Sequence, residues 1–198
     1  MVKKQIRILG IDDAPFSRFE DETVLIVGAV FRGADYIDAV LSTRAEVDGI
    51  DATQKLANMI NESRTKDQLR CIMLDGITIG GFNVVNINAL CKTTGLPVLV
   101  FIKDLPDFKA IKNALKNLED GDDRMKIIEA AGKIYECEIK NKDVGITGKV
   151  YFQVAGTDAE TARKILKLTC QHGFVPEPLR IAHIIAQGIK FGESKGRA

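Results

Sequence analysis

The chain has 198 residues, of which 45% are hydrophobic and 28% are charged. This composition suits one α/β domain with a full core, and it excludes a disordered or fibrous chain. The net charge of about +1 lends no support to nucleic-acid binding, although a local basic patch can bind DNA on a neutral protein. No apolar run is long enough for a signal peptide or a membrane span, so we expect a cytoplasmic protein.

The first quarter of the chain predicts three β-strands, at residues 5–11, 23–32 and 36–45. The second run (TVLIVGAVFR) is nearly all apolar, which predicts a strand buried on both faces. Short turns that contain polar residues or glycine separate the three runs. This spacing favours an antiparallel meander.

The period of the apolar residues then becomes helical, which predicts a helix from Asp51, a residue that can cap its free N–H groups. The rest of the chain predicts a strand at 70–74, a helix at 83–94, a strand at 97–102, helices at 106–118 and 121–131, strands at 133–139 and 149–156, and helices at 158–170 and 178–190. The alternation of strand and helix up to residue 102 favours parallel strands in this part of the sheet.

Acidic residues lie at the ends of two predicted strands and at the start of one predicted helix. Asp12 and Asp13 close the first strand, Asp51 opens the first helix, and Asp75 closes the fourth strand. If the first and fourth strands are neighbours, these acids meet at one edge of the sheet. Carboxylates gathered this way repel one another unless a cation neutralises them, and hard oxygen ligands suit Mg²⁺ or Mn²⁺. The spacing is typical of a metal site that hydrolyses phosphodiesters.

Each acid also has a structural interpretation, which the residues alone leave open. Asp51 can serve only as a helix cap, and Asp75 with Gly76 can form a simple turn. Asp12 and Asp13 can begin a loop. Adjacent residues of a strand face opposite ways, so we expect only one of these two to point into a site.

Short motifs in the chain resemble those of endonuclease V, a nuclease of the ribonuclease H-like superfamily, whose order of elements is also similar. Residues 10–12 (Gly-Ile-Asp) resemble the Gly-Val-Asp that ends the first strand of that family, and 74–76 (Leu-Asp-Gly) resemble its Asp-Gly motif. Residues 95–98 (Gly-Leu-Pro-Val) are similar to its Gly-Ile-Pro strand entry. The segment 176–183 (PEPLRIAH) resembles its C-terminal motif and is the most specific match.

An archaeal branch, endonuclease dU, is similar over essentially the whole chain. The resemblance is carried by Gly-Ile-Asp-Asp at 10–13, Val-Asp-Gly-Ile-Asp-Ala-Thr at 47–53, and Pro-Glu-Pro at 176–178. It implies one ribonuclease H-like domain over residues 1–198, of α/β class. The expected sheet is mixed, with an antiparallel three-strand meander followed by parallel strands, and helices flank it.

The resemblance also implies an Mg²⁺- or Mn²⁺-dependent endonuclease that hydrolyses DNA near a deaminated base, with deoxyuridine a candidate. The implied metal ligands are Asp12, Asp51 and Asp75, whose carboxylates should lie close together, with Lys103 and His183 assisting catalysis. The implied substrate-binding residues are Gly76, Gly80, Gly81 and Phe82, in a loop whose backbone would read the base. The Gly-x-Asp register selects Asp12 over Asp13.

A second interpretation is a nucleic-acid-binding or regulatory module that keeps the nuclease fold without efficient catalysis. Endonuclease V has Phe-Arg-Glu at the position of Asp51, so a shorter carboxylate stands here and the arginine is missing. A small-molecule enzyme on an α/β scaffold is a third interpretation, which rests on fold ambiguity alone. The chain lacks the glycine-rich signatures of nucleotide-cofactor binding.

Overall fold

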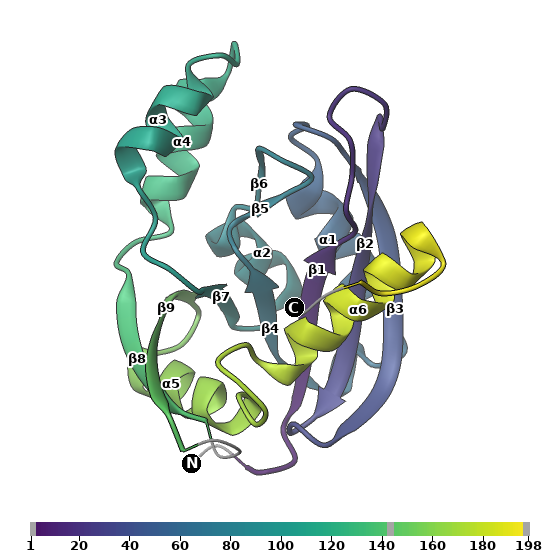
Figure 1. The fold of residues 1–198 in the computed structure, drawn as a ribbon, viewed down its shortest axis with the longest axis vertical. Coiled ribbons are helices and arrows are strands. Elements are labelled where there is room, and N and C mark those ends of the chain that lie inside the picture. The colour runs from purple at the N-terminus through teal and green to yellow at the C-terminus, as the bar shows by residue number, and fades with distance from the viewer. Residues whose placement is uncertain (1–2, 142–144, 196–198) are drawn as a thin grey trace.

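The computed structural model describes residues 3–141 and 145–195. These residues contain a seven-stranded mixed sheet in the order β3-β2-β1-β4-β7-β9-β8 and a small two-stranded sheet, β5-β6. The strands are β1 (Arg7–Asp13), β2 (Thr23–Arg32), β3 (Tyr36–Glu46), β4 (Leu69–Asp75), β5 (Thr78–Ile79), β6 (Asn83–Val84), β7 (Val98–Ile102), β8 (Tyr135–Lys140) and β9 (Thr147–Ala155). Figure 1 shows the large sheet running through the centre of the molecule.

The sheet confirms the predicted α/β class and the ribonuclease H-like arrangement. β1, β2 and β3 form the antiparallel meander, and β4 and β7 continue from β1 in parallel. β9 then pairs antiparallel with β7, and β8 pairs antiparallel with β9. Because β1 and β4 are parallel neighbours, their carboxyl ends meet at one edge of the sheet.

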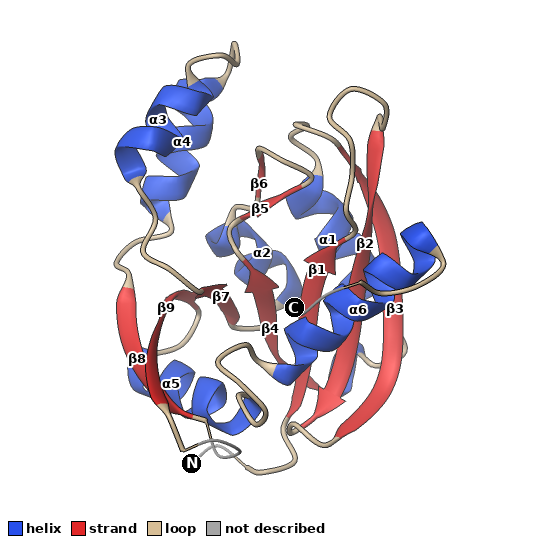
Figure 2. Ribbon diagram, viewed as in Figure 1, coloured by secondary structure: helices blue, strands red, loops and turns tan. Residues whose placement is uncertain are grey.

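Helices cover both faces of this sheet (Figure 2). They are α1 (Ala52–Asn61), α2 (Ile87–Thr94), α3 (Phe108–Leu115), α4 (Gly121–Ala130), α5 (Ala159–Thr169) and α6 (Glu177–Phe191). In Figure 1, α6 crosses in front of β1 and β2, and α1 and α2 lie behind the sheet. The pair α3 and α4 stands away from the body of the molecule. Among the described residues, no helix has the combined length and apolarity that a membrane span requires.

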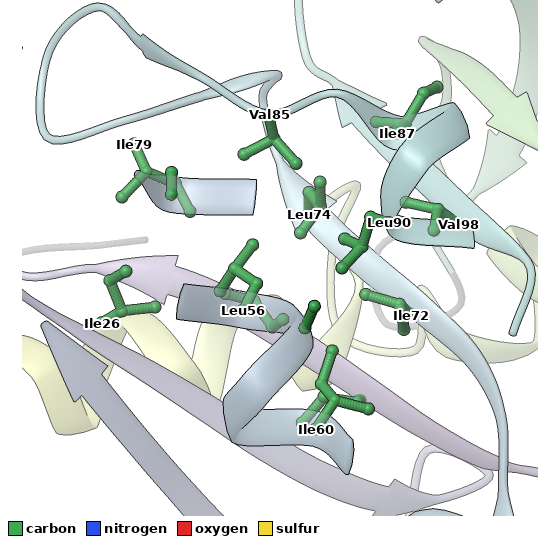
Figure 3. Close-up of a cluster of buried hydrophobic side chains, with 14 of the residues drawn as sticks. Ile26, Leu56, Ile60, Ile72, Leu74, Ile79, Val85, Ile87, Leu90 and Val98 are labelled. Carbon is green, nitrogen blue, oxygen red and sulfur yellow. The ribbon is translucent and has the colours of Figure 1, made fainter. Parts of the chain in front are cut away.

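The core behind the sheet joins α1 and α2 to the central strands. Leu56 and Ile60 lie one turn apart on α1, so both side chains point at the sheet. Figure 3 shows them facing Ile72 and Leu74 of β4, with Leu90 of α2 closing the cluster. These side chains are fully buried, and removing them from water supplies the main stabilisation of this layer.

The predicted helix at 83–94 is wrong at its start. Residues 83–84 form β6, which pairs with β5, and α2 begins only at Ile87. The side chain of Asn83 is fully buried and accepts the backbone N–H of Ala52 at 3.0 Å, which anchors this residue outside the helix. Asn86 then caps α2 by accepting the N–H of Ala89 at 3.0 Å.

Helix α6 approaches β1 more closely than a side chain would allow. A Cβ atom at Gly10 would lie 2.4 Å from the carbonyl carbon of Pro178, in the first turn of α6. That atom belongs to the backbone of a packed helix and cannot move aside alone. Because Gly10 of the Gly-Ile-Asp motif has no side chain, α6 can pack at this short distance from β1.

We predict that Gly10→Ala lowers the free energy of unfolding by about 1–3 kcal/mol, because the added methyl group overpacks the contact with α6. Gly188→Ala is the matched control, since an added Cβ there meets no atom within 4 Å. Gly188 lies inside α6, so alanine should stabilise by about 0.5–1 kcal/mol. Urea unfolding of both variants measures the difference, and equal stabilities would contradict the close contact.

Candidate active site

An open pocket of about 480 Å³ lies at the carboxyl ends of β1 and β4. Three carboxylates line it, those of Asp12, Asp13 and Asp75, together with the imidazole of His183. The strand pairing explains this gathering, because Ile11 of β1 lies opposite Leu74 of β4 and the acids follow directly. The structure thus brings together Asp12, Asp75 and His183, which sequence analysis singled out.

Asp12 and His183 are joined across two elements that lie far apart in the sequence. His183 Nδ1 lies 2.7 Å from Asp12 Oδ2, and His183 Nε2 lies 2.9 Å from the amide nitrogen of Gln187. Gln187 Oε1 accepts the backbone N–H of Lys195 at 3.0 Å, which assigns the orientation of its amide. The amide nitrogen therefore donates to His183 Nε2. In this network the Nδ1–H of His183 donates to Asp12.

Asp13 lies in the same pocket, contrary to the expectation that only one of the pair would point inward. Asp13 faces the side of the sheet opposite to Asp12, and its Oδ2 accepts the backbone N–H of Gly80 at 2.7 Å. Both acids reach the pocket because it opens beyond the end of the strand, where the two faces of the sheet meet. The consecutive Asp-Asp pair was the sequence signal for this third carboxylate.

Burial and mutual repulsion shift the titration of these acids. Asp12 is 8% exposed, and its burial, followed by the charges of Asp75 and Asp13, raises its pKa to about 7. The hydrogen bond from His183 opposes this rise. Burial also raises the pKa of Asp13 and of Asp75, but Asp75 is exposed at the mouth of the pocket, so water weakens the effect there.

Asp51 is not among the residues that line this pocket. Its Oδ1 accepts the backbone N–H of Glu46 at 3.1 Å and the side-chain amide of Asn83 at 2.7 Å. Asp51 is the N-cap residue of α1, yet its side chain makes no capping hydrogen bond. The structure places this acid in the junction between β3, β6 and α1 instead of beside Asp12 and Asp75.

Comparisons with known proteins match the whole chain to one family. The sequence model of the family described as Endonuclease dU matches residues 4–190. The chain belongs to this family. A UPF0215 protein of Methanosarcina mazei is 51% identical over 201 residues, a match that covers 100% of this chain and 97% of the relative.

Two solved structures place this endonuclease dU family member among similar folds. A protein of unknown function from Archaeoglobus fulgidus is 38% identical with a TM-score of 0.81, over 92% of this chain and 97% of that one. Endonuclease V from Ciona intestinalis, in complex with DNA that contains inosine, is 13% identical with a TM-score of 0.59, over 89% and 82% of the two chains. Family and fold together support a nuclease.

The loop at 76–82 in this family member is a support for the site. Gly80 donates its N–H to Asp13, and its carbonyl accepts the N–H of Asp48 at 2.8 Å. The N–H of Phe82 donates to Asp48 Oδ1 at 2.7 Å, and the carbonyl of Phe82 accepts from Arg124. These backbone groups, expected to read a base, are thus bonded within the protein.

Asp48 supports the site, although its sequence context did not mark it as a site residue. It has a left-handed backbone with φ of 53°, which is uncommon for a residue other than glycine. A Cβ at Gly81 would lie 2.3 Å from Asp48 Oδ1, so only glycine allows the contact between the two loops. The Val-Asp-Gly sequence before Asp51 carried this signal, since Asp and Gly favour such turns.

Lys103 and Gly76 lie near Asp75, just beyond the strands that end at the pocket. Lys103 is exposed just beyond β7, and its positive charge opposes part of the rise in the pKa of Asp75 that burial causes. Gly76 follows Asp75 with φ of 79°, and its N–H donates to the carbonyl of Phe101 at 3.0 Å. The charge of this basic side chain therefore acts on the exposed carboxylate of Asp75.

The donor set fits a hard divalent cation. Within residues 3–141 and 145–195, no three His, Cys, Asp or Glu side chains already surround one point as metal ligands do. The carboxylates of Asp12, Asp13 and Asp75 nevertheless share one pocket, and oxygen donors are those that Mg²⁺ and Mn²⁺ prefer. Asp75 accepts no hydrogen bond from the described residues, so its side chain can turn toward Asp12.

The raised pKa of Asp12 predicts how the stability of the protein depends on pH without divalent cations. The folded state keeps a proton on Asp12 between pH 3.8 and about 7, where the unfolded chain has lost it. The free energy of unfolding should therefore fall as the pH rises through this window. Thermal unfolding in EDTA across the window measures this effect.

Asp75→Asn should make this pH dependence shallower, because one repelling charge is gone. Asp35→Asn is the control, since Asp35 is exposed in the β2–β3 turn, at the opposite edge of the sheet. A stability of the wild-type protein that rises steadily from pH 4 to pH 7 in EDTA would contradict the raised pKa of Asp12.

Proposed function

We propose that this protein is a Mg²⁺- or Mn²⁺-dependent endonuclease that hydrolyses a phosphodiester in DNA near a deaminated base. The observation that carries the proposal is the set of three carboxylates, Asp12, Asp13 and Asp75, which two adjacent parallel strands bring into one open pocket beside His183. Membership of the Endonuclease dU family supports deoxyuridine as that base. The similar endonuclease V in complex with inosine-containing DNA supports DNA as the partner.

Asp12, Asp13 and Asp75 would hold the cation. When bound, a divalent cation activates water for attack and stabilises the charge on the leaving oxygen. Asp12 and Asp13 are pinned by His183 and Gly80, so two of the three ligands are already oriented. Such preorganisation matters because a ligand that must be ordered during binding costs affinity.

His183 acts in this proposal as a positioning residue for Asp12. Its Nδ1–H holds Asp12, and its Nε2 accepts from Gln187, so both ring nitrogens have partners. Partners of metal-bound carboxylates typically contribute 10- to 100-fold to metal affinity or activity. Lys103 would contact the scissile phosphate, since it lies near Asp75.

Asp75→Asn should reduce nicking of deoxyuridine-containing DNA by at least about 10²-fold, because one metal ligand loses its charge. The same variant should lose the rise in melting temperature that Mg²⁺ produces in the wild-type protein, a readout independent of activity. Asp35→Asn should keep both properties. Undiminished nicking by Asp75→Asn would refute the assignment of the site.

Asp13→Asn and Asp51→Asn decide which acid is the third ligand. In each case asparagine keeps the side-chain oxygen that accepts the observed hydrogen bonds and removes only the charge. Nicking should fall at least about 10²-fold for Asp13→Asn and less than about threefold for Asp51→Asn. Equal losses of nicking in the two variants would mean that Asp51 is also a metal ligand.

The alternative function is a binding module without efficient catalysis, which is favoured by the absence of three already convergent ligands in the described residues. It predicts that the wild-type protein binds DNA with equal affinity with and without Mg²⁺ and never nicks it. A nicking assay with Mg²⁺ and Mn²⁺, on strands that contain deoxyuridine, hypoxanthine or only normal bases, separates the two functions. Metal-dependent nicking of any of these strands would exclude the alternative that the protein is a binding module without catalysis.

A further inference from the structure

The loop between β1 and β2, residues 14–22, forms a wall between two hollows. Ala14, Pro15 and Phe16 line the carboxylate pocket and also a second hollow of about 180 Å³. Figure 1 shows this loop rising beyond the edge of the sheet at which β1 ends. A polymer that is bound in the carboxylate pocket and extends toward β2 would cross this loop.

The second hollow carries a positive charge. Its charged lining groups are Arg44, Lys190 and Asp21, so two cations face one carboxylate. Lys190 is paired with Asp21 at 2.8 Å, whereas among the described residues the Arg44 guanidinium donates only to the hydroxyl of Thr23, at 3.3 Å. Arg44 thus keeps donors for an anion, and the hollow suits a phosphate group that follows the cleaved one.

Phe19 lies at the tip of the same loop and is 99% exposed. The turn that carries it is held on both sides. Ser17 donates its N–H to Asp21 Oδ2 at 2.9 Å, and the guanidinium of Arg18 lies 4.8 Å from the centre of the Phe82 ring. A fully exposed ring on an anchored turn contributes no burial to folding, and it is free to contact a ligand.

Phe19 is close enough to the carboxylate pocket to contact the same DNA strand. It follows Phe16, which lines the pocket, by three residues, so their Cα atoms are at most about 11 Å apart. Successive nucleotides of a DNA strand are about 3.4 Å apart along the helix axis. The Phe19 ring can therefore meet a base of a strand that crosses this loop, a few nucleotides from the scissile phosphate.

We propose that residues 14–22 form a contact surface for the DNA strand, with Phe19 stacked on a nucleobase and Arg44 bound to a neighbouring phosphate. The inference rests on the proposed function and names how the same site holds its substrate. Aromatic rings stack on any base, because every base has a π-face. Since a stacked base must leave its own pair or stack, this surface favours sites with an unpaired or weakly paired base.

Fluorescence of 2-aminopurine tests the stacking in EDTA, where cleavage does not interfere. The probes are single-stranded oligonucleotides with one deoxyuridine and with 2-aminopurine one to four nucleotides away. The wild-type protein should quench the probe at one or two of these positions. Phe19→Ala should abolish the quenching and weaken binding by about 5- to 150-fold, and Phe19→Trp should retain both.

Tyr36→Ala is the matched control for Phe19. Tyr36 is 63% exposed and pairs with Arg32 at the end of the sheet opposite to the carboxylates. The Tyr36→Ala variant should bind the oligonucleotides and quench the 2-aminopurine fluorescence as the wild-type protein does. If Phe19→Ala behaved like Tyr36→Ala, the stacking contact would be refuted.

The salt dependence of binding tests the phosphate contact. Arg44→Ala should reduce the slope of log affinity against log salt by about 0.7, the value for one phosphate contact on a single strand. Arg64→Ala is the matched control, because Arg64 is exposed before β4, at the opposite edge of the sheet. An unchanged slope in Arg44→Ala would mean that Arg44 makes no contact with a phosphate.

The outcomes for this surface and for the nuclease proposal are separable. Quenching and binding that depend on Phe19, without metal-dependent nicking, would support the surface and refute the nuclease. Nicking that is indifferent to Phe19→Ala and Arg44→Ala would refute the surface and leave the nuclease intact. A wild-type protein that binds none of the probes would refute the surface.

Discussion

The arrangement of the candidate site depends on the backbone contact between Gly10 and Pro178. It sets where α6 begins over β1, and both elements then advance toward the same edge of the sheet. Asp12 follows Gly10 by two residues on the strand, and His183 follows Pro178 by five residues, or about 1.4 turns, on the helix. Asp12 and His183 are therefore within hydrogen-bond distance, at 2.7 Å, although 171 positions separate them.

The same edge concentrates negative charge at a cost to the metal-free protein. Burial raises the pKa of Asp12, Asp13 and Asp75, and the neighbouring carboxylates add to this rise for Asp12 and Asp75. Backbone and imidazole donors offset part of the cost without removing the charges. The proposed cation would neutralise this repulsion, which links the carboxylate cluster to the proposed chemistry.

Two acids near the pocket, Asp48 and Asp51, have structural roles although they resemble metal ligands. Asp48 joins the segment after β3 to the loop at 76–82, and Asp51 joins it to Asn83. Each carboxylate accepts hydrogen bonds from backbone or amide donors of neighbouring segments. Together they hold the loop whose Gly80 orients Asp13. These acids act on the site through its support.

The sequence by itself determined the meander, the strands that follow it and the placement of Asp12 and Asp75 at strand ends, because apolar periodicity and element order are local properties. The pairing of β1 with β4, which makes those ends neighbours, came from the tertiary structure. The short motif at residues 176–183 also identified the segment that contains His183 as part of the site. Only the tertiary structure decided that Asp13 joins the pocket and that Asp51 does not. That choice depends on which donors, Gly80 or Asn83, each carboxylate meets after distant segments pack, and no spacing along the chain encodes those contacts.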